Sequence, residues 1–84
     1  MSYDLIYTDK AKKQLKKLDK PSQERIIHTL ERCRIRPHSH VKKLVGNPYF
    51  RLRVGELRII VDIKDNKLHI MVLEIDHRKK IYKK

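Results

Sequence analysis

Apolar and polar residues alternate through the second half of this chain, and this pattern constrains the fold more than any other feature. The alternation runs through residues 49–54, 57–64 and 67–76, and each segment is rich in the branched apolar residues that strands favour. Short polar breaks separate the segments, as in antiparallel hairpins. We therefore predict three consecutive antiparallel strands.

The two breaks also predict which side chains share a face. Two-residue loops at Gly55-Glu56 and Asp65-Asn66 would pair Arg53 with Arg58, and Ile60 with Met71. One predicted face is wholly apolar: Leu52, Val54, Leu57, Ile59, Val61, Ile63, Leu68, Ile70 and Val72. The other face is half basic and half apolar: Arg51, Arg53, Arg58, Ile60, Asp62, His69, Met71, Leu73 and Ile75.

Two helices are predicted before these strands. A first strand spans residues 2–8, and Thr8 or Asp9 can cap a helix that runs to about Leu18. Ser22 can cap a second helix, which Pro37 would end after Arg36. The predicted fold class is α+β, one small domain over residues 1–84 in the order β-α-α-β-β-β. A helical hairpin should pack on the apolar face of a curved, antiparallel-rich sheet, and residues 77–84 form a basic tail.

Charge and cysteine content narrow the functional classes. The 84 residues include 22 Lys and Arg against 10 Asp and Glu, a net charge of +12. Such a balance favours nucleic acid, the ribosome, an acidic membrane surface or an acidic protein as partner. No apolar run approaches the ~20 residues of a membrane span, and the N-terminus lacks a signal peptide. With Cys33 as its single cysteine, the chain is expected to be cytoplasmic, without a membrane partner.

Three arginines mark the most informative candidate site. Arg51, Arg53 and Arg58 should lie on one face and flank a tight turn. Like charges placed directly opposite each other destabilise a sheet, so their placement suggests a polyanionic ligand. Phosphate is the obvious candidate, because the guanidinium fork matches it bidentately. The alternative is an ordinary solvated face of a basic protein.

The C-terminal tail is a second candidate. His77 and Tyr82 are acid–base residue types, and Arg78 could stabilise charge on a phosphorane-like transition state. A nonspecific electrostatic arm is the simpler alternative. The five histidines form no recognised metal motif, and the sequence has no phosphate-binding glycine loop, so we expect no metal and no cofactor.

Residues 43–61, KLVGNPYFRLRVGELRIIV, and the ending DHRKKIY over residues 76–82 together resemble the RelE/ParE superfamily of toxins from type II toxin–antitoxin systems. In the RelE branch the toxin enters the ribosomal A site, and the 2′-OH of the messenger attacks the adjacent phosphate without a metal. The resemblance implies an mRNA endoribonuclease of this kind. The alternatives are a ParE-type toxin that poisons DNA gyrase and a non-catalytic module that binds RNA or the ribosome.

The resemblance also implies residue roles. Arg53, Arg58 and Arg78 would hold the scissile phosphate, and Tyr82, or second His77, would transfer the proton. Arginine stays protonated, so Arg53 is a poor base where some relatives carry lysine; the base is then Tyr82, His77 or a ribosomal group. Further RNA contacts are expected from basic residues: Arg51, Lys43, Lys79 and Lys80.

An antitoxin is the expected resting partner. The apolar part of the basic face should contact a cognate acidic antitoxin in a hetero-oligomer, because exposed apolar patches mark interfaces and the positive charge attracts an acidic chain. The expected contact residues are Ile60, Met71 and Leu73.

Overall fold

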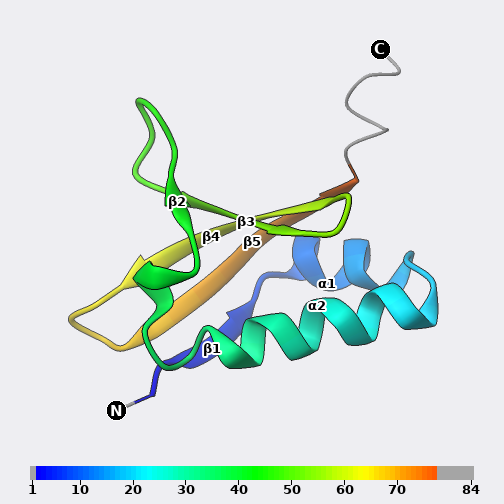
Figure 1. Ribbon diagram of the computed structural model, residues 1–84, viewed down its shortest axis with the longest axis horizontal. Helices are drawn as coiled ribbons and strands as arrows, with labels where there is room; N and C mark the ends of the chain where they lie inside the picture. The colour runs from blue at the N-terminus through cyan, green and yellow to red at the C-terminus, as the bar shows by residue number, and fades with distance from the viewer. Residues whose placement is uncertain (1, 78–84) are drawn as a thin grey trace.

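The computed structural model describes residues 2–77 of the chain (Figure 1). Its elements in chain order are β1 (Asp4–Tyr7), α1 (Asp9–Lys16), α2 (Lys20–Arg32), the 3-10 turn η1 (Pro37–Ser39), β2 (Lys42–Lys43), β3 (Phe50–Val54), β4 (Leu57–Lys64) and β5 (His69–His77). The predicted order is confirmed, with the short strand β2 added. None of the helices in residues 2–77 is long and apolar enough to span a membrane.

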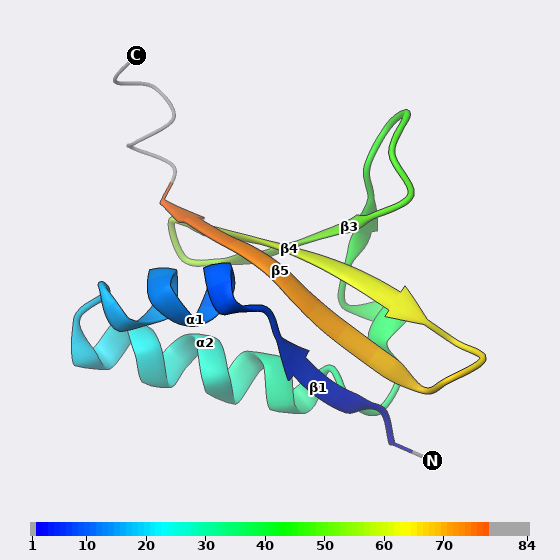
Figure 2. The same cartoon turned by 180° about the vertical axis from the view of Figure 1, so that it is seen from behind.

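The five strands form one mixed sheet in the order β1-β5-β4-β3-β2. Strand β1 runs parallel to β5, and every other neighbouring pair is antiparallel. Both helices lie on one side of this sheet, and the other side is open (Figures 1 and 2). We call the helix-covered side the inner face and the open side the outer face. The predicted α+β architecture, with its helical hairpin on one sheet face, is therefore confirmed.

The helix starts follow from local chemistry, with one correction. Thr8 caps α1 as predicted: its Oγ1 accepts a hydrogen bond from the Ala11 N–H at 3.1 Å. The second helix begins earlier than predicted, with Asp19 rather than Ser22 at the N-cap position. Pro21 then lies in the first turn, where its missing N–H leaves no hydrogen bond unmade.

Both predicted helix ends were too late. The first helix ends at Lys16, and the second ends at Arg32, four residues before the predicted Arg36. Arg36 takes a left-handed conformation with φ 84°, and Pro37 follows it. The residue before a proline avoids the helical region, so the chain had to leave the helix before this point.

The inner face carries the core. Its buried residues come from both helices and from strands β3 to β5: Ala11, Ile26, Leu30, Cys33, Leu52, Val54, Leu57, Ile59, Val61, Ile63, Ile70, Val72 and Ile75. Eight of the nine predicted inner-face residues are buried here, and Leu68 alone is not. Burying such side chains contributes about 1.5–3 kcal/mol each, so this face supplies most of the stability.

The loop between β4 and β5 is longer than predicted. The last strand pair is Lys64 with His69, so residues 65–68 form the connection. Leu68 takes φ 54° there, and its N–H donates to the Asp65 carbonyl at 3.3 Å. The register shifts by two residues, which leaves Ile63 opposite Ile70 rather than Leu68. A shift of two keeps each side chain on its predicted face, because side chains alternate with period two.

A β-bulge in β5 causes a larger change. Val61 pairs with Val72, but Ile60 pairs with Glu74, so Leu73 is an extra residue. Beyond it the alternation reverses, and Ile75 turns inward with 4% of its surface exposed. The prediction that Ile75 lies on the outer face was therefore wrong. The reversal brings two carboxylates, Glu74 and Asp76, to the outer face instead.

Candidate functional site

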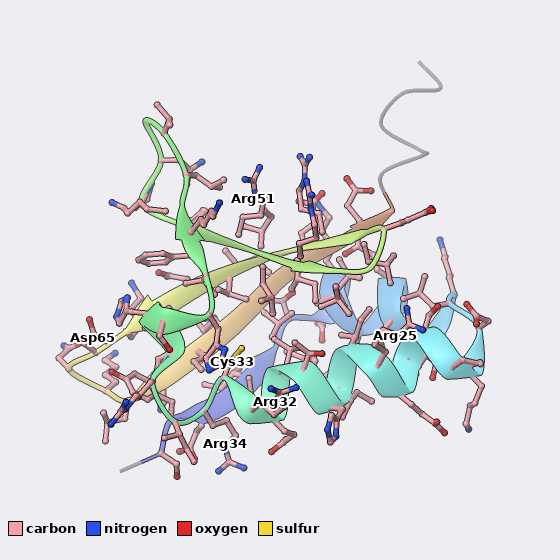
Figure 3. All side chains as sticks on the ribbon, viewed as in Figure 1. Arg25, Arg32, Cys33, Arg34, Arg51 and Asp65 are labelled. Atoms are coloured by element: carbon pink, nitrogen blue, oxygen red, sulfur yellow. The ribbon has the colours of Figure 1, made fainter. Side chains whose placement is uncertain are left out.

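Three arginines lie on the outer face, as the hairpin pattern predicted. Arg53 on β3 pairs directly with Arg58 on β4, and Arg51 pairs with Ile60. Figure 3 shows Arg51 pointing away from the two helices. We call the outer side of β3, β4 and β5 around these residues the arginine face.

Within residues 2–77, no hydrogen bond or ion pair holds the guanidinium group of Arg51, Arg53 or Arg58. Direct opposition of Arg53 and Arg58 is unfavourable in a sheet without a counterion. The free donors and the unbalanced charge make this face suited to an anionic ligand, above all to phosphate.

A hollow of ≈ 350 Å³ lies beside the arginines, and two of the polar residues that line it, His40 and Lys42, were not predicted from the sequence as part of this site. Its lining residues are His40, Lys42, Arg51, Leu52 and Arg53. Lys42 belongs to β2 and pairs with Arg51, which extends the row of positive charge to the edge of the sheet. A two-residue strand has too little pattern to be recognised in advance, so the pairing was not predictable.

Lys43, a predicted RNA contact, lies elsewhere. It pairs with Phe50, and its Nζ atom lies 5.9 Å from the centre of that ring. Because Phe50 packs against the core, Lys43 stands on the side opposite Arg51. The strand alternation thus brings Lys42, not Lys43, to the arginine face.

Carboxylates interrupt the positive charge of the arginine face. Asp62 forms an ion pair with Lys64 at 3.3 Å, and Glu74 forms one with Lys10 of α1, also at 3.3 Å. Asp76 is the direct cross-strand neighbour of Arg58. Sequence reasoning missed Glu74 and Asp76, since strict alternation assigned both of them to the inner face.

The predicted antitoxin contacts also lie on the outer face. Ile60 and Met71 are partly buried there, and Leu73 is the extra residue of the bulge. Met71 lies between Asp62 on β4 and Ile6 on β1. These apolar side chains therefore form the middle of a face whose ends are charged.

The predicted acid–base residues lie at or beyond the limit of the described chain. His77 ends β5, and its backbone pairs with Leu57, the residue before Arg58. Arg78, Lys79, Lys80 and Tyr82 lie outside the described residues. Strand β5 therefore ends beside Arg58, at the Arg53–Arg58 end of the hairpin.

A second polar cluster joins three distant parts of the chain. Asp65, in the loop after β4, accepts a hydrogen bond from the Tyr3 hydroxyl at 2.7 Å and contacts His38 Nε2 at 2.8 Å. These hydrogen bonds, from Tyr3 first and His38 second, hold the pKa of Asp65 below its ordinary value. The same bond raises the pKa of Tyr3. We call this cluster the Asp65 clasp, and its contacts give it a structural role.

The residues of the clasp do not make a metal centre. Among residues 2–77, no group of three or more His, Cys, Asp or Glu side chains is arranged to hold a metal ion. His38 Nε2 is hydrogen-bonded to Asp65. The His38 ring packs edge-on against the Phe50 ring, with the two ring centroids 5.3 Å apart. His38 therefore contributes to packing at this end of the sheet.

Comparison with solved structures finds the same fold in chains of toxin–antitoxin complexes. The chain is similar to one in the toxin–antitoxin complex RelBE2 from Mycobacterium tuberculosis, with 23% identity, 93% of each chain covered and a TM-score of 0.86. A chain of the archaeal RelE–RelB complex from Pyrococcus horikoshii OT3 matches with 24% identity, covers 93% of this chain and 97% of its own, and gives a TM-score of 0.81. A chain of the RelB–RelE complex from Methanococcus jannaschii has 27% identity, 92% and 94% coverage, and a TM-score of 0.71.

Comparison by sequence shows the family. None of the curated proteins matches this sequence. A family model described as the ParE toxin of the type II toxin–antitoxin system parDE matches residues 5–82, nearly the whole chain. The fold, the arginine face and this match agree: the chain belongs to the ParE toxin family of type II toxin–antitoxin systems, within the RelE/ParE superfamily.

Proposed function

We propose that this toxin is an endoribonuclease that acts in the ribosomal A site and cleaves translated mRNA without a metal ion. The observation that carries the proposal is the arginine face, where Arg53 and Arg58 oppose each other and no described residue neutralises Arg53. Lys42 and Arg51 continue this positive row to the sheet edge. A row of phosphate-binding donors on an open sheet fits a single RNA strand.

The chemistry needs charge stabilisation more than any other contribution. The 2′-OH attacks the adjacent phosphorus, the bond to the 5′-oxygen breaks, and a 2′,3′-cyclic phosphate and a 5′-OH result. Arg53, Arg58 and Arg78 would stabilise the negative charge that develops on the phosphoryl oxygens. Because arginine is a poor base, Tyr82, His77 or a ribosomal group would take the 2′-OH proton.

An acidic antitoxin would cover the toxin at rest. The similar chains from M. tuberculosis and P. horikoshii come from complexes with an antitoxin, and we propose the same kind of hetero-oligomer here. The outer-face residues Ile60, Met71 and Leu73 offer an apolar contact, and the net charge of +12 would attract an acidic chain. Replacement of Met71 by Glu should then weaken antitoxin binding in a pull-down, and an unchanged affinity would contradict this contact.

A second candidate function follows from the family model, whose description names a ParE toxin. Such a toxin would inhibit DNA gyrase, and the arginine face would contact gyrase or DNA instead of mRNA. A non-catalytic module that binds RNA or the ribosome is the third reading, and it predicts binding without cleavage.

Primer extension on mRNA from cells that express the toxin separates these functions. The proposed activity predicts new 5′ ends within translated codons, which should disappear in the Arg58→Ala variant. Purified toxin should leave gyrase supercoiling unchanged. Intact mRNA together with trapped gyrase–DNA breaks would establish the second candidate, whereas intact mRNA with ribosome binding would establish the third.

A further inference from the structure

A row of three charged residues crosses the arginine face from strand to strand. Arg53 on β3 pairs with Arg58 on β4, and Arg58 pairs in turn with Asp76 on β5. Directly opposite residues place their Cβ atoms about 4.5–5.5 Å apart, within reach of long side chains. Arg58 is therefore flanked by a like charge on one side and an opposite charge on the other.

Asp76 differs from the other two carboxylates of this face. Asp62 is paired with Lys64, and Glu74 is paired with Lys10. Asp76 forms no ion pair with any residue among residues 2–77, and its cross-strand neighbour is Arg58. Of the three carboxylates, Asp76 is thus the one placed to act on the arginines.

The β-bulge is what creates this arrangement. Without the extra residue Leu73, Asp76 would follow the inner-face alternation, and Ile75 would lie opposite the arginines. Bulges often redirect a side chain at a functional position. Here the bulge replaces an apolar neighbour of Arg58 with a carboxylate.

We propose that Asp76 lowers the positive potential around Arg58 from the neighbouring strand, without an ion pair to its guanidinium, so that RNA is bound more weakly and less indiscriminately than the arginines alone would allow. The proposal rests on the proposed function, in which the arginine face contacts RNA phosphates. It adds a carboxylate that tunes this contact. Opposite charges in such pairs offset the like-charge repulsion between Arg53 and Arg58.

A binding experiment with four single variants and the Arg58→Ala/Asp76→Asn double variant tests the proposal. The probe is a single-stranded RNA oligonucleotide with 2′-O-methyl groups, which binds but cannot be cleaved by its own 2′-OH. Its affinity is measured by fluorescence anisotropy over a range of salt concentrations for the wild type, Asp76→Asn, Asp76→Glu and Arg58→Ala. Glu24→Gln on α2 is the matched control, because it makes the same charge change on an exposed position of the helical layer.

The expected result is tighter binding by Asp76→Asn, by about 2- to 5-fold at low salt, as an exposed charge pair allows. The slope of log affinity against log salt should steepen by up to about 0.7, the value of one further phosphate contact on a single strand. Asp76→Glu should restore wild-type binding. In the Arg58→Ala background Asp76→Asn should have no further effect, because Asp76 acts through Arg58.

The outcomes separate this inference from the proposed function. If Arg58→Ala weakens binding but Asp76→Asn behaves like Glu24→Gln, the RNA face stands and the role of Asp76 is refuted. Weaker binding by Asp76→Asn, or an equal gain in the Arg58→Ala background, also refutes it. If Arg58→Ala leaves RNA binding unchanged, the arginine face is not the RNA contact, and both the proposed function and this inference fail.

Discussion

The two faces of the sheet obey different rules. The inner face is a continuous layer of buried aliphatic side chains under both helices, and strict alternation along the strands accounts for nearly all of it. The outer face mixes arginines, carboxylates and partly buried apolar residues, and its composition changes at the bulge. The inner face stabilises the domain, whereas the outer face places charge where a ligand can reach it. Four predictions test this division, in order of decreasing expected effect.

The largest effect is expected from a pair of adjacent isoleucines. Ile59 is fully buried on the inner face, and Ile60 is only partly buried on the outer face. Ile59→Ala should lower the free energy of unfolding by about 2–5 kcal/mol, because it leaves a cavity in a packed core. Ile60→Ala should cost clearly less in the same urea titration. Equal losses would show that the outer face is also a core surface.

The arginine face should carry activity without carrying stability. Arg58→Ala should reduce the proposed mRNA cleavage by about 10²–10³-fold, or about 2.7–4 kcal/mol, as loss of one charge-stabilising donor does elsewhere. Its urea midpoint should stay close to that of the wild type. Arg32→Ala, on the exposed side of α2, removes the same charge from the other layer and should remain fully toxic. Toxicity lost in both variants would point to net charge alone.

A smaller effect is expected where α1 meets the sheet. The Thr8 hydroxyl accepts from Ala11 N–H and donates to the Val72 carbonyl at 3.1 Å, so it links the start of the helix to β5. Thr8→Ala should lower stability by about 0.5–2 kcal/mol through loss of this cap. Thr29→Ala, whose hydroxyl contacts only its own helix, is the control in a thermal melt. A control as damaging as Thr8→Ala would argue against the cap.

The smallest effect is expected from the Asp65 clasp, which is exposed at the end of β4. The folded state lowers the pKa of Asp65, so the clasp stabilises the protein above the ordinary pKa of 3.8, and this contribution is lost as pH falls through the lower folded value. Asp65→Asn should therefore melt slightly below the wild type at pH 7, and the difference should vanish in strong acid. A gap that persists at low pH would show that the carboxylate charge is not responsible.

Local sequence patterns were sufficient to predict much of the fold and the central arginine pair of the candidate site. The alternation around Gly55 predicted the Arg53–Arg58 pair, because a two-residue turn leaves one possible register. Gly55 has φ 61°, a left-handed conformation that glycine adopts at little cost. The polar residue Thr8 before an apolar helical pattern likewise predicted the first cap. These features depend on residues that are close together in the chain.

Other features depend on contacts between distant segments, and no local pattern contains them. Strand β2 exists because Lys42 meets Arg51, and the Asp65 clasp exists because the loop after β4 lies beside Tyr3 and His38.

The bulge at Leu73 belongs to the same group. An unbroken alternation of residues 67–76 assigns Ile75 to the outer face and Asp76 to the inner one. In the folded protein Ile75 packs into the core and Asp76 lies on the open outer face opposite Arg58, because burying an unpaired charge in the core is far more costly than inserting one extra residue in a strand. The amino-acid order thus specifies the helices, the strands and the opposed arginines, and the packing of the assembled sheet decides which acidic residues stand beside them.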